Sequence, residues 1–261
     1  MRAAARHMEA AVPAPDPALW DAAMFGDTEE ARQLLLGGAN IEEPGAIGVQ
    51  ELFTPLQISV DQCHQEVVQL LLENGADVSV RDDNDNDTPL HTAASDGNEA
   101  VALLLLQHGA DVSARNKHGE TPLHKATTNG KGSVAGLLIQ HGANVSATDT
   151  RALGYPGGWT ALHMAAYGGH AAVVEMLIEH RANVLAETNT RLISQETNTG
   201  LTPQDLATSQ SHLQVVAMLK AEAVTRAKCV AFAMGHHERL GVGSPVDGLK
   251  PEVLRMVLEQ V

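Results

Sequence analysis

The chain has 261 residues, of which 44% are hydrophobic and 3% aromatic, and its 17 Lys and Arg against 32 Asp and Glu give a net charge of −15. Nucleic acids and anionic membranes attract basic surfaces, so this balance argues against both and favours a protein partner with a basic surface. Two cysteines cannot build a disulfide framework, and no apolar stretch reaches the roughly 18 residues of a membrane-spanning helix. We expect a cytoplasmic protein, with the nucleus as the alternative.

Residues 1–16 contain two arginines and several alanines, as a transit peptide does, but also Glu9 and Asp16. They lack the apolar run of at least seven residues that is typical of a secretory signal. We expect this segment to be disordered, with an organelle-targeting signal as the alternative.

Two short sequence patterns recur along the rest of the chain with a shared period. Such internal repetition is typical of proteins built from stacked units. The first pattern is Thr-Pro-Leu-His, and the second is Gly-Ala followed by Asn or Asp. The first occurs, with small variations, at 54–57, 88–91, 121–124 and 160–163, and the second at 38–40, 75–77, 109–111, 142–144 and, with Arg in place of Gly, 181–183.

Each pattern has a physical role in a unit of two paired helices. A Thr hydroxyl caps the free N–H groups at a helix start, and Pro fits the first turn because no hydrogen bond is lost there. Pairs of small residues such as Ala93-Ala94 let a second helix pack closely, which accounts for the scarcity of aromatic residues. Apolar runs such as 101–106 predict that second helix, and the following Gly predicts its left-handed end. Arg181, where this Gly is expected, predicts either a left-handed non-Gly residue or a different helix end.

This repeat resembles the ankyrin repeat, whose T-P-L-H-x-A pattern it matches closely. The resemblance covers residues 17–222 and implies six repeats, of which the first and last are degenerate, as terminal repeats are expected to be. It implies an all-α ankyrin-repeat solenoid whose paired helices are joined by hairpin-like turns. We expect a disordered segment at 1–16, the repeat domain at 17–223 and a helical tail at 224–261 that caps the last repeat.

The 13 histidines do not indicate a metal site or a catalytic site. His91, His124 and His163 occupy the motif, where the resemblance implies that the imidazole ties neighbouring loops together. No Cys and His spacing offers the three or four convergent ligands of a metal centre, and no phosphate loop or nucleophile motif occurs. We therefore expect a non-catalytic protein without a metal or cofactor.

The acidic run at 82–87 is similar to the start of a calcium-binding loop, but it departs from that pattern. Counted from Asp83, the sixth residue should be Gly and is Thr88, and the twelfth should be Glu and is Ala94. We interpret the run as a solvated turn between two repeats. The alternative is that Asp83 and Asp85 contact a basic partner.

The resemblance places partner contacts on the concave face, late in each first helix and on the turn tips. The helix positions vary between repeats while the surrounding motif does not, although they could simply face solvent. The predicted partner-binding residues are Met24, Phe25, Asp61, Gln62, Ser95, Asp96, Thr128, Asn129 and Tyr167 on the helices, and Asp83, Asp85, Lys117, His118, Tyr155, Trp159 and Arg191 on the turns.

Three turns are enlarged, at 40–53, 149–159 and 185–201. Insertions in repeat proteins often lie on the binding face, although drift in a tolerant surface loop is the alternative. Tyr155, Trp159 and Tyr167 are three of the seven aromatic residues and are typical of binding hot spots. We expect them to contact the partner, with packing beneath the turn as the alternative for Trp159.

The tail at 224–261 has two interpretations. Apolar spacing predicts a helix at 224–234 that ends at Gly235 and a second helix from Pro251, which together would cap repeat six. The tail also faintly resembles a suppressor-of-cytokine-signalling box, through Cys229, Ala233 and Leu254, although Thr225 replaces the expected Leu. This alternative implies a substrate receptor of a ubiquitin ligase, with elongin and a cullin as partners.

Overall fold

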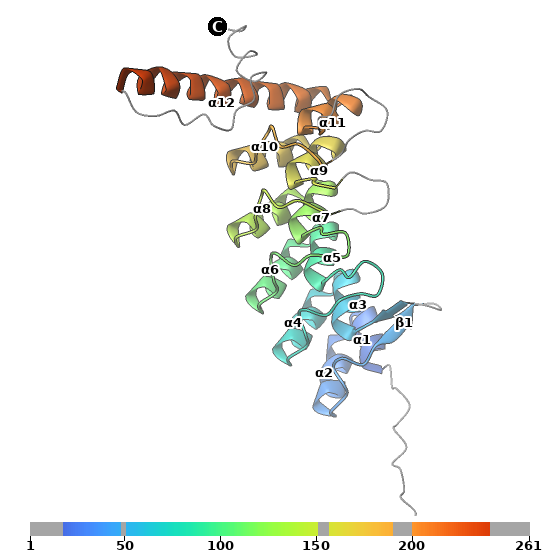
Figure 1. The fold of residues 1–261 in the computed structure, drawn as a ribbon. Coiled ribbons are helices and arrows are strands. Elements are labelled where there is room, and N and C mark those ends of the chain that lie inside the picture. The colour runs from blue at the N-terminus through green and yellow to red at the C-terminus, as the bar shows by residue number, and fades with distance from the viewer. Residues whose placement is uncertain (1–17, 48–50, 151–156, 190–199, 241–261) are drawn as a thin grey trace, which may run out of the picture.

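The computed structural model describes residues 18–47, 51–150, 157–189 and 200–240. Within these ranges the first helix of each pair lies in one column and the second helix in a neighbouring column, as Figure 1 shows. The turns between pairs project beyond the column of first helices (Figure 1). The first helices are α1 (Ala18–Phe25), α3 (Pro55–Asp61), α5 (Pro89–Asp96), α7 (Pro122–Thr128), α9 (Ala161–Gly168) and α11 (Pro203–Ser209). The second helices are α2 (Thr28–Leu36), α4 (Gln65–Glu73), α6 (Glu99–Gln107), α8 (Gly132–Gln140), α10 (Ala171–Glu179) and α12 (Leu213–Leu240).

Thr residues begin the first helices from the second pair onward, as the sequence predicts. At each start the Thr side chain pairs with the backbone of the third helical residue, whose own side chain accepts a hydrogen bond from the Thr N–H. Gln57 Oε1, for example, accepts from the Thr54 N–H at 2.8 Å. The five capping Thr residues are Thr54, Thr88, Thr121, Thr160 and Thr202.

Left-handed residues follow the second helices, and this prediction is also confirmed. Gly38, Gly75, Gly109 and Gly142 have φ between 85° and 91°. Arg181 adopts the same conformation, with φ 63°, although its Cβ makes the left-handed region unfavourable by about 1–2 kcal/mol. Repeat five therefore ends its second helix as the others do, at a conformational cost.

The core runs along the array between the two helix columns. It consists of Leu, Val, Ile and Ala side chains, including the fully buried Leu90, Leu123 and Leu162 of successive first helices. Trp20 is the one aromatic residue in this buried core among the described residues. Aliphatic side chains thus fill the interior, in agreement with the low aromatic content.

The first enlarged turn forms a β-hairpin beside the first helix. Strands β1 (Gly45–Ile47) and β2 (Glu51–Phe53) pair antiparallel, with Gly45 opposite Phe53. A Cβ atom on Gly45 would lie 2.2 Å from Trp20 Cδ2, so only Gly allows the hairpin to approach the indole ring.

The all-α solenoid is confirmed, but the predicted separate helix at 224–234 is wrong. Helix α12 is continuous from Leu213 to Leu240 and passes through Gly235. The second helix of repeat six therefore extends into the tail, and the expected boundary at residue 223 falls inside it. A single Gly lowers helix stability but does not end a helix whose neighbours on both sides remain helical. In the described part of the chain, no helix is long and apolar enough to cross a membrane.

Candidate protein-interaction face

The ends of the first helices and the projecting turns form one surface, which we call the inner face. The inner face corresponds to the surface that the resemblance predicts as concave. Phe25 is 75% exposed and Tyr167 is 47% exposed, and these are the exposed large aromatic side chains of the described residues. Other predicted contact residues on this face are also exposed, namely Asp61, Gln62, Asp96, Thr128 and Asn129, whereas Met24 and Ser95 are half-buried.

Three buried histidines hold the turns of the inner face in place. Each Nδ1 accepts a hydrogen bond from the backbone N–H of the Thr that caps its helix, at 3.1 to 3.2 Å. Nδ1 therefore carries no proton, and Nε2–H donates to a carbonyl oxygen in the next repeat. The three bonds, each 3.1 Å long, are His91 to Glu120, His124 to Trp159 and His163 to Leu201. The predicted role of these histidines as ties between loops is confirmed.

Burial keeps the three imidazole rings neutral. Removal from water lowers the pKa of His124 to about 4, and it lowers the pKa values of His91 and His163 as well. Protonation would also place a proton on Nδ1, where the Thr N–H already points. These rings are thus structural donors and are poorly suited to acid–base catalysis at neutral pH.

A second group of histidines fixes the backbone of the contact residues. The Nε2 atoms of His64, His170 and His212 lie 3.1, 2.9 and 3.0 Å from carbonyl oxygens of the preceding repeat. Those carbonyl groups belong to Met24, Thr128 and Tyr167, which are predicted contact residues. Each ring lies over a left-handed Gly, because a Cβ atom on Gly26, Gly130 or Gly169 would approach it to 2.6 Å.

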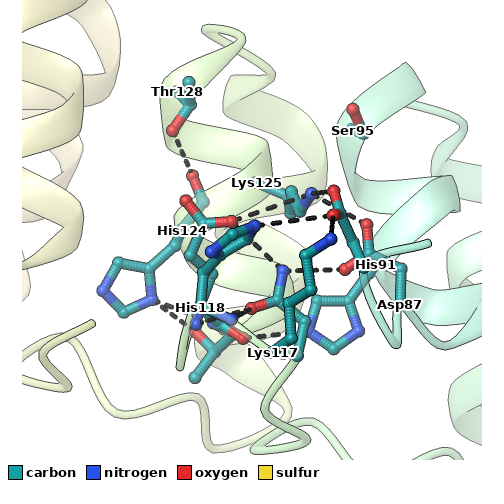
Figure 2. A network of polar contacts seen from close by, with 12 residues as sticks. Asp87, His91, Ser95, Lys117, His118, His124, Lys125 and Thr128 are labelled. Atoms are coloured by element: carbon teal, nitrogen blue, oxygen red, sulfur yellow. Dashed lines mark hydrogen bonds and ion pairs between the residues drawn. The ribbon is translucent and has the colours of Figure 1, made fainter. Parts of the chain in front are cut away.

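The acidic turn at 82–87 is paired with lysines of the next repeat, as Figure 2 shows. Lys117 Nζ lies 2.6 Å from Asp85 Oδ1, and Lys125 Nζ lies 2.8 Å from Asp87 Oδ2. His118 Nε2 lies 3.5 Å from Asp85 Oδ1. The turn is therefore bridged to its neighbour by charge, which the sequence analysis did not anticipate.

The pKa shifts in this network agree with the pairing. The hydrogen bond from Lys117 lowers the pKa of Asp85, which burial alone would raise. Burial alone would lower the pKa of Lys125, but Asp87, Glu120 and Asp85 outweigh it and raise that pKa. Asp85 and Lys117, both predicted contact residues, pair with each other, and Asp83 is exposed.

The structure brings Trp159 and Tyr167 together. Their ring centroids are 5.5 Å apart and the planes meet at 66°, a T-shaped arrangement. The Trp159 backbone forms the base of the second enlarged turn, because its N–H donates to Asp149 Oδ1 and its carbonyl accepts from the Asp149 N–H. The indole is half-buried, and it contacts the rings of His163 and the exposed Tyr167. Tyr155 and Arg191 lie outside the described residues.

Polar contact residues in the middle of the face bond to the scaffold. The Asn129 Nδ2 donates to the Ser95 carbonyl oxygen at 3.2 Å and to Ser95 Oγ at 2.8 Å. The Thr128 hydroxyl donates to the His124 carbonyl oxygen at 2.8 Å (Figure 2). These bonds hold the polar side chains at the end of α7 against the neighbouring backbone, whereas Phe25 and Tyr167 stay exposed.

Comparisons with known families agree with this repeat architecture. A family model of ankyrin repeats (three copies) matches residues 6–82 and 81–149, and the single ankyrin repeat model matches residues 157–189. The chain belongs to the ankyrin-repeat family, whose members act in protein–protein interaction. A search of curated proteins found no match. The resemblance of the tail to a cytokine-signalling box has no counterpart in the matched ranges and stays a prediction.

Proposed function

We propose that this chain is a non-catalytic scaffold that binds a segment of another protein along its inner face. The observation that carries the proposal is the exposure of Phe25 and Tyr167 on a face whose other exposed contact residues, among those described, are polar or charged. Exposed aromatic side chains supply large contact area at low entropic cost, and Tyr and Trp are enriched at binding hot spots. The half-buried Trp159 supports Tyr167 from beneath and would restrict its motion when a partner binds.

Charge supports a basic segment as the partner. Asp61 and Asp96 are exposed on neighbouring first helices, and the chain as a whole carries a net charge of −15. Partial burial and then the charge of Asp61 raise the pKa of Asp96, so the two carboxylates repel each other. A Lys or Arg of the partner would relieve this repulsion. Association should therefore slow as ionic strength rises. An association rate that does not depend on salt concentration would contradict the electrostatic part of the proposal.

Affinity measurements on matched variants test the proposed face. Tyr167→Ala and Trp159→Ala should each weaken partner binding by about 2 kcal/mol if they are hot spots. Leu36→Ala removes another exposed apolar side chain, 77% exposed on a second helix, and should leave affinity unchanged. The partner is first recovered by affinity purification and mass spectrometry with the unmodified chain. If Trp159→Ala lowers thermal stability and keeps affinity, Trp159 belongs to packing alone.

The alternative function is a substrate receptor of a cullin–elongin ubiquitin ligase. It rests on Cys229 and Ala233, one turn apart in α12, and on Leu254, which lies outside the described residues. Recovery of elongin and a cullin in the same purification would favour this function. Cys229→Asp should then abolish their recovery while the partner on the inner face stays bound.

A further inference from the structure

The junction between repeats two and three lacks the histidine ties found elsewhere in the array. Gln57 occupies the motif position held by His91, His124 and His163. Its Oε1 accepts from the Thr54 N–H as an imidazole Nδ1 does, but its Nε2 is buried without a hydrogen-bond partner. The equivalent acceptor would be the carbonyl oxygen of Asp87, the residue before Thr88. The Asp87 carbonyl oxygen accepts one hydrogen bond, from the Asp82 N–H. The Glu120 carbonyl oxygen of the next turn likewise accepts from the Asn116 N–H, and it also accepts from His91 Nε2.

The second type of tie is also missing at this junction. Asn98 stands where His64, His170 and His212 stand in other repeats, and its Oδ1 caps its own helix through the Val101 N–H at 3.1 Å. The residue of repeat two at the position of Gly26, Gly130 and Gly169 is Cys63, a left-handed residue with φ 60°. Among the described residues, neither of these two types of tie therefore joins repeats two and three.

Like charges meet across the same junction. Asp61 ends α3 and Asp96 ends α5, and the two helices pack against each other. The raised pKa of Asp96, which follows from its partial burial and then from the charge of Asp61, agrees with this geometry. The positive charge of Lys131 has the opposite effect, because it lowers the pKa of Asp96. Apart from hydrogen bonds between the adjoining turns, such as the one from Arg81 Nη1 to the Arg115 carbonyl oxygen at 2.8 Å, apolar packing holds this junction against electrostatic repulsion.

The junction before it is more strongly connected. His64 Nε2 lies 3.1 Å from the Met24 carbonyl oxygen, and the Asp77 N–H donates to Glu42 Oε1 at 2.7 Å. Trp20 is buried against the hairpin at Gly45, which joins the first and second repeats. Repeats one and two are thus tied to each other more firmly than to repeat three.

We propose that the array contains a hinge between α4 and α5, at which α1–α4 open away from the rest of the array as one unit. Stability in a repeat array is a sum of repeat and nearest-neighbour terms, so the weakest interface sets where the array opens. The hinge crosses the inner face between Asp61 and Asp96, so opening changes the spacing of residues on that face. This inference concerns the scaffold and does not depend on the proposed binding function.

Native-state hydrogen exchange of the full chain tests the hinge. The slowest amides of α1, α2, α3 and α4 should share one opening equilibrium and exchange faster than those of α5 to α8. Ordinary fraying gives a different result, in which protection rises steadily from α1 through α4 into α5. That graded pattern would overturn the proposal.

Matched substitutions should strengthen the junction between repeats two and three or weaken another junction. Gln57→His should supply the missing tie and slow exchange in α1–α4 by about five- to tenfold, the effect of one hydrogen bond. His124→Gln is the reverse change, and it should create a new boundary between α8 and α9. Should Gln57→His misfold, Asp61→Asn removes the repulsion and should slow the same amides. Unchanged exchange in α1–α4 in the folded variants would overturn the proposal.

Discussion

Acid should destabilise the array through its buried histidines, and His124 allows the size of the effect to be worked out. Its pKa is about 4 in the folded protein and 6.5 in an unperturbed chain. Above pH 6.5 both states are neutral at this site and its contribution to stability is complete. As the pH falls, the unfolded chain binds the proton first, so the free energy of unfolding decreases until the pH is below about 4. This linkage gives a loss of about 2 kcal/mol at pH 5 and about 3 kcal/mol below pH 4.

Urea denaturation at pH 8 and pH 5 measures this loss when the wild-type protein is compared with His124→Gln. Gln keeps an acceptor and a donor at the site, as Gln57 does in repeat two, but it does not titrate. Other titrating groups contribute equally to the pH dependence of both proteins. At low pH Asp85 loses its stabilising charge, and Asp96 loses the charge that Asp61 repels. The variant should therefore lose about 2 kcal/mol less than the wild type between the two pH values.

A control variant separates this effect from a general response to losing a histidine. His108 is exposed at the end of α6 and its ring bonds to the Leu104 carbonyl oxygen of the same helix, so His108→Gln removes a histidine but no tie between repeats. Equal pH dependence in His124→Gln and the wild type would contradict this linkage. It would mean that the buried ring takes up its proton in the folded state as easily as in the unfolded chain.

Three further changes should alter stability in defined directions. Arg181→Gly should raise the free energy of unfolding by about 1 kcal/mol, because Gly adopts the left-handed conformation without strain, and chemical denaturation would show it. Lys125→Met should lower it by about 2 kcal/mol, because the largely buried Lys125 side chain is hydrogen-bonded to Asp87, and an unchanged value would contradict the pairing. Deleting residues 224–261 removes the Arg226 guanidinium from the Ala182 carbonyl oxygen, 2.9 Å away, and should lower the thermal midpoint of the last repeats. Unchanged stability with lost elongin recruitment would favour the docking-box interpretation of the tail.

The repeat pattern was sufficient to predict the helix pairs, their caps and the role of the motif histidines, because each follows from local chemistry at a fixed spacing. Thr88 and His91 illustrate this, since their capping box depends only on residues three apart. Contacts between repeats were less accessible from sequence. The pairing of Lys117 with Asp85 joins residues 32 positions apart and requires the stacking geometry of two turns.

The tail shows where local signals mislead. Gly235 was expected to end a helix, but α12 continues through it to Leu240. The packing of the helix on repeat six is a tertiary effect, seen in the burial of Val215 and Leu219, and periodicity does not report it. For the inner face, the sequence could identify variable positions, but only the structure separates the exposed Phe25 from the half-buried Met24.

Hydrogen exchange of the complex is the most direct test of whether the inner face binds a protein partner. A partner bound there should slow exchange at the ends of α1, α3, α5, α7 and α9 and at the turns that join them. Exchange along α2, α4, α6, α8 and α10 should stay as in the free protein. Protection confined to these second helices or to α12, with the inner face unchanged, would contradict binding at the inner face.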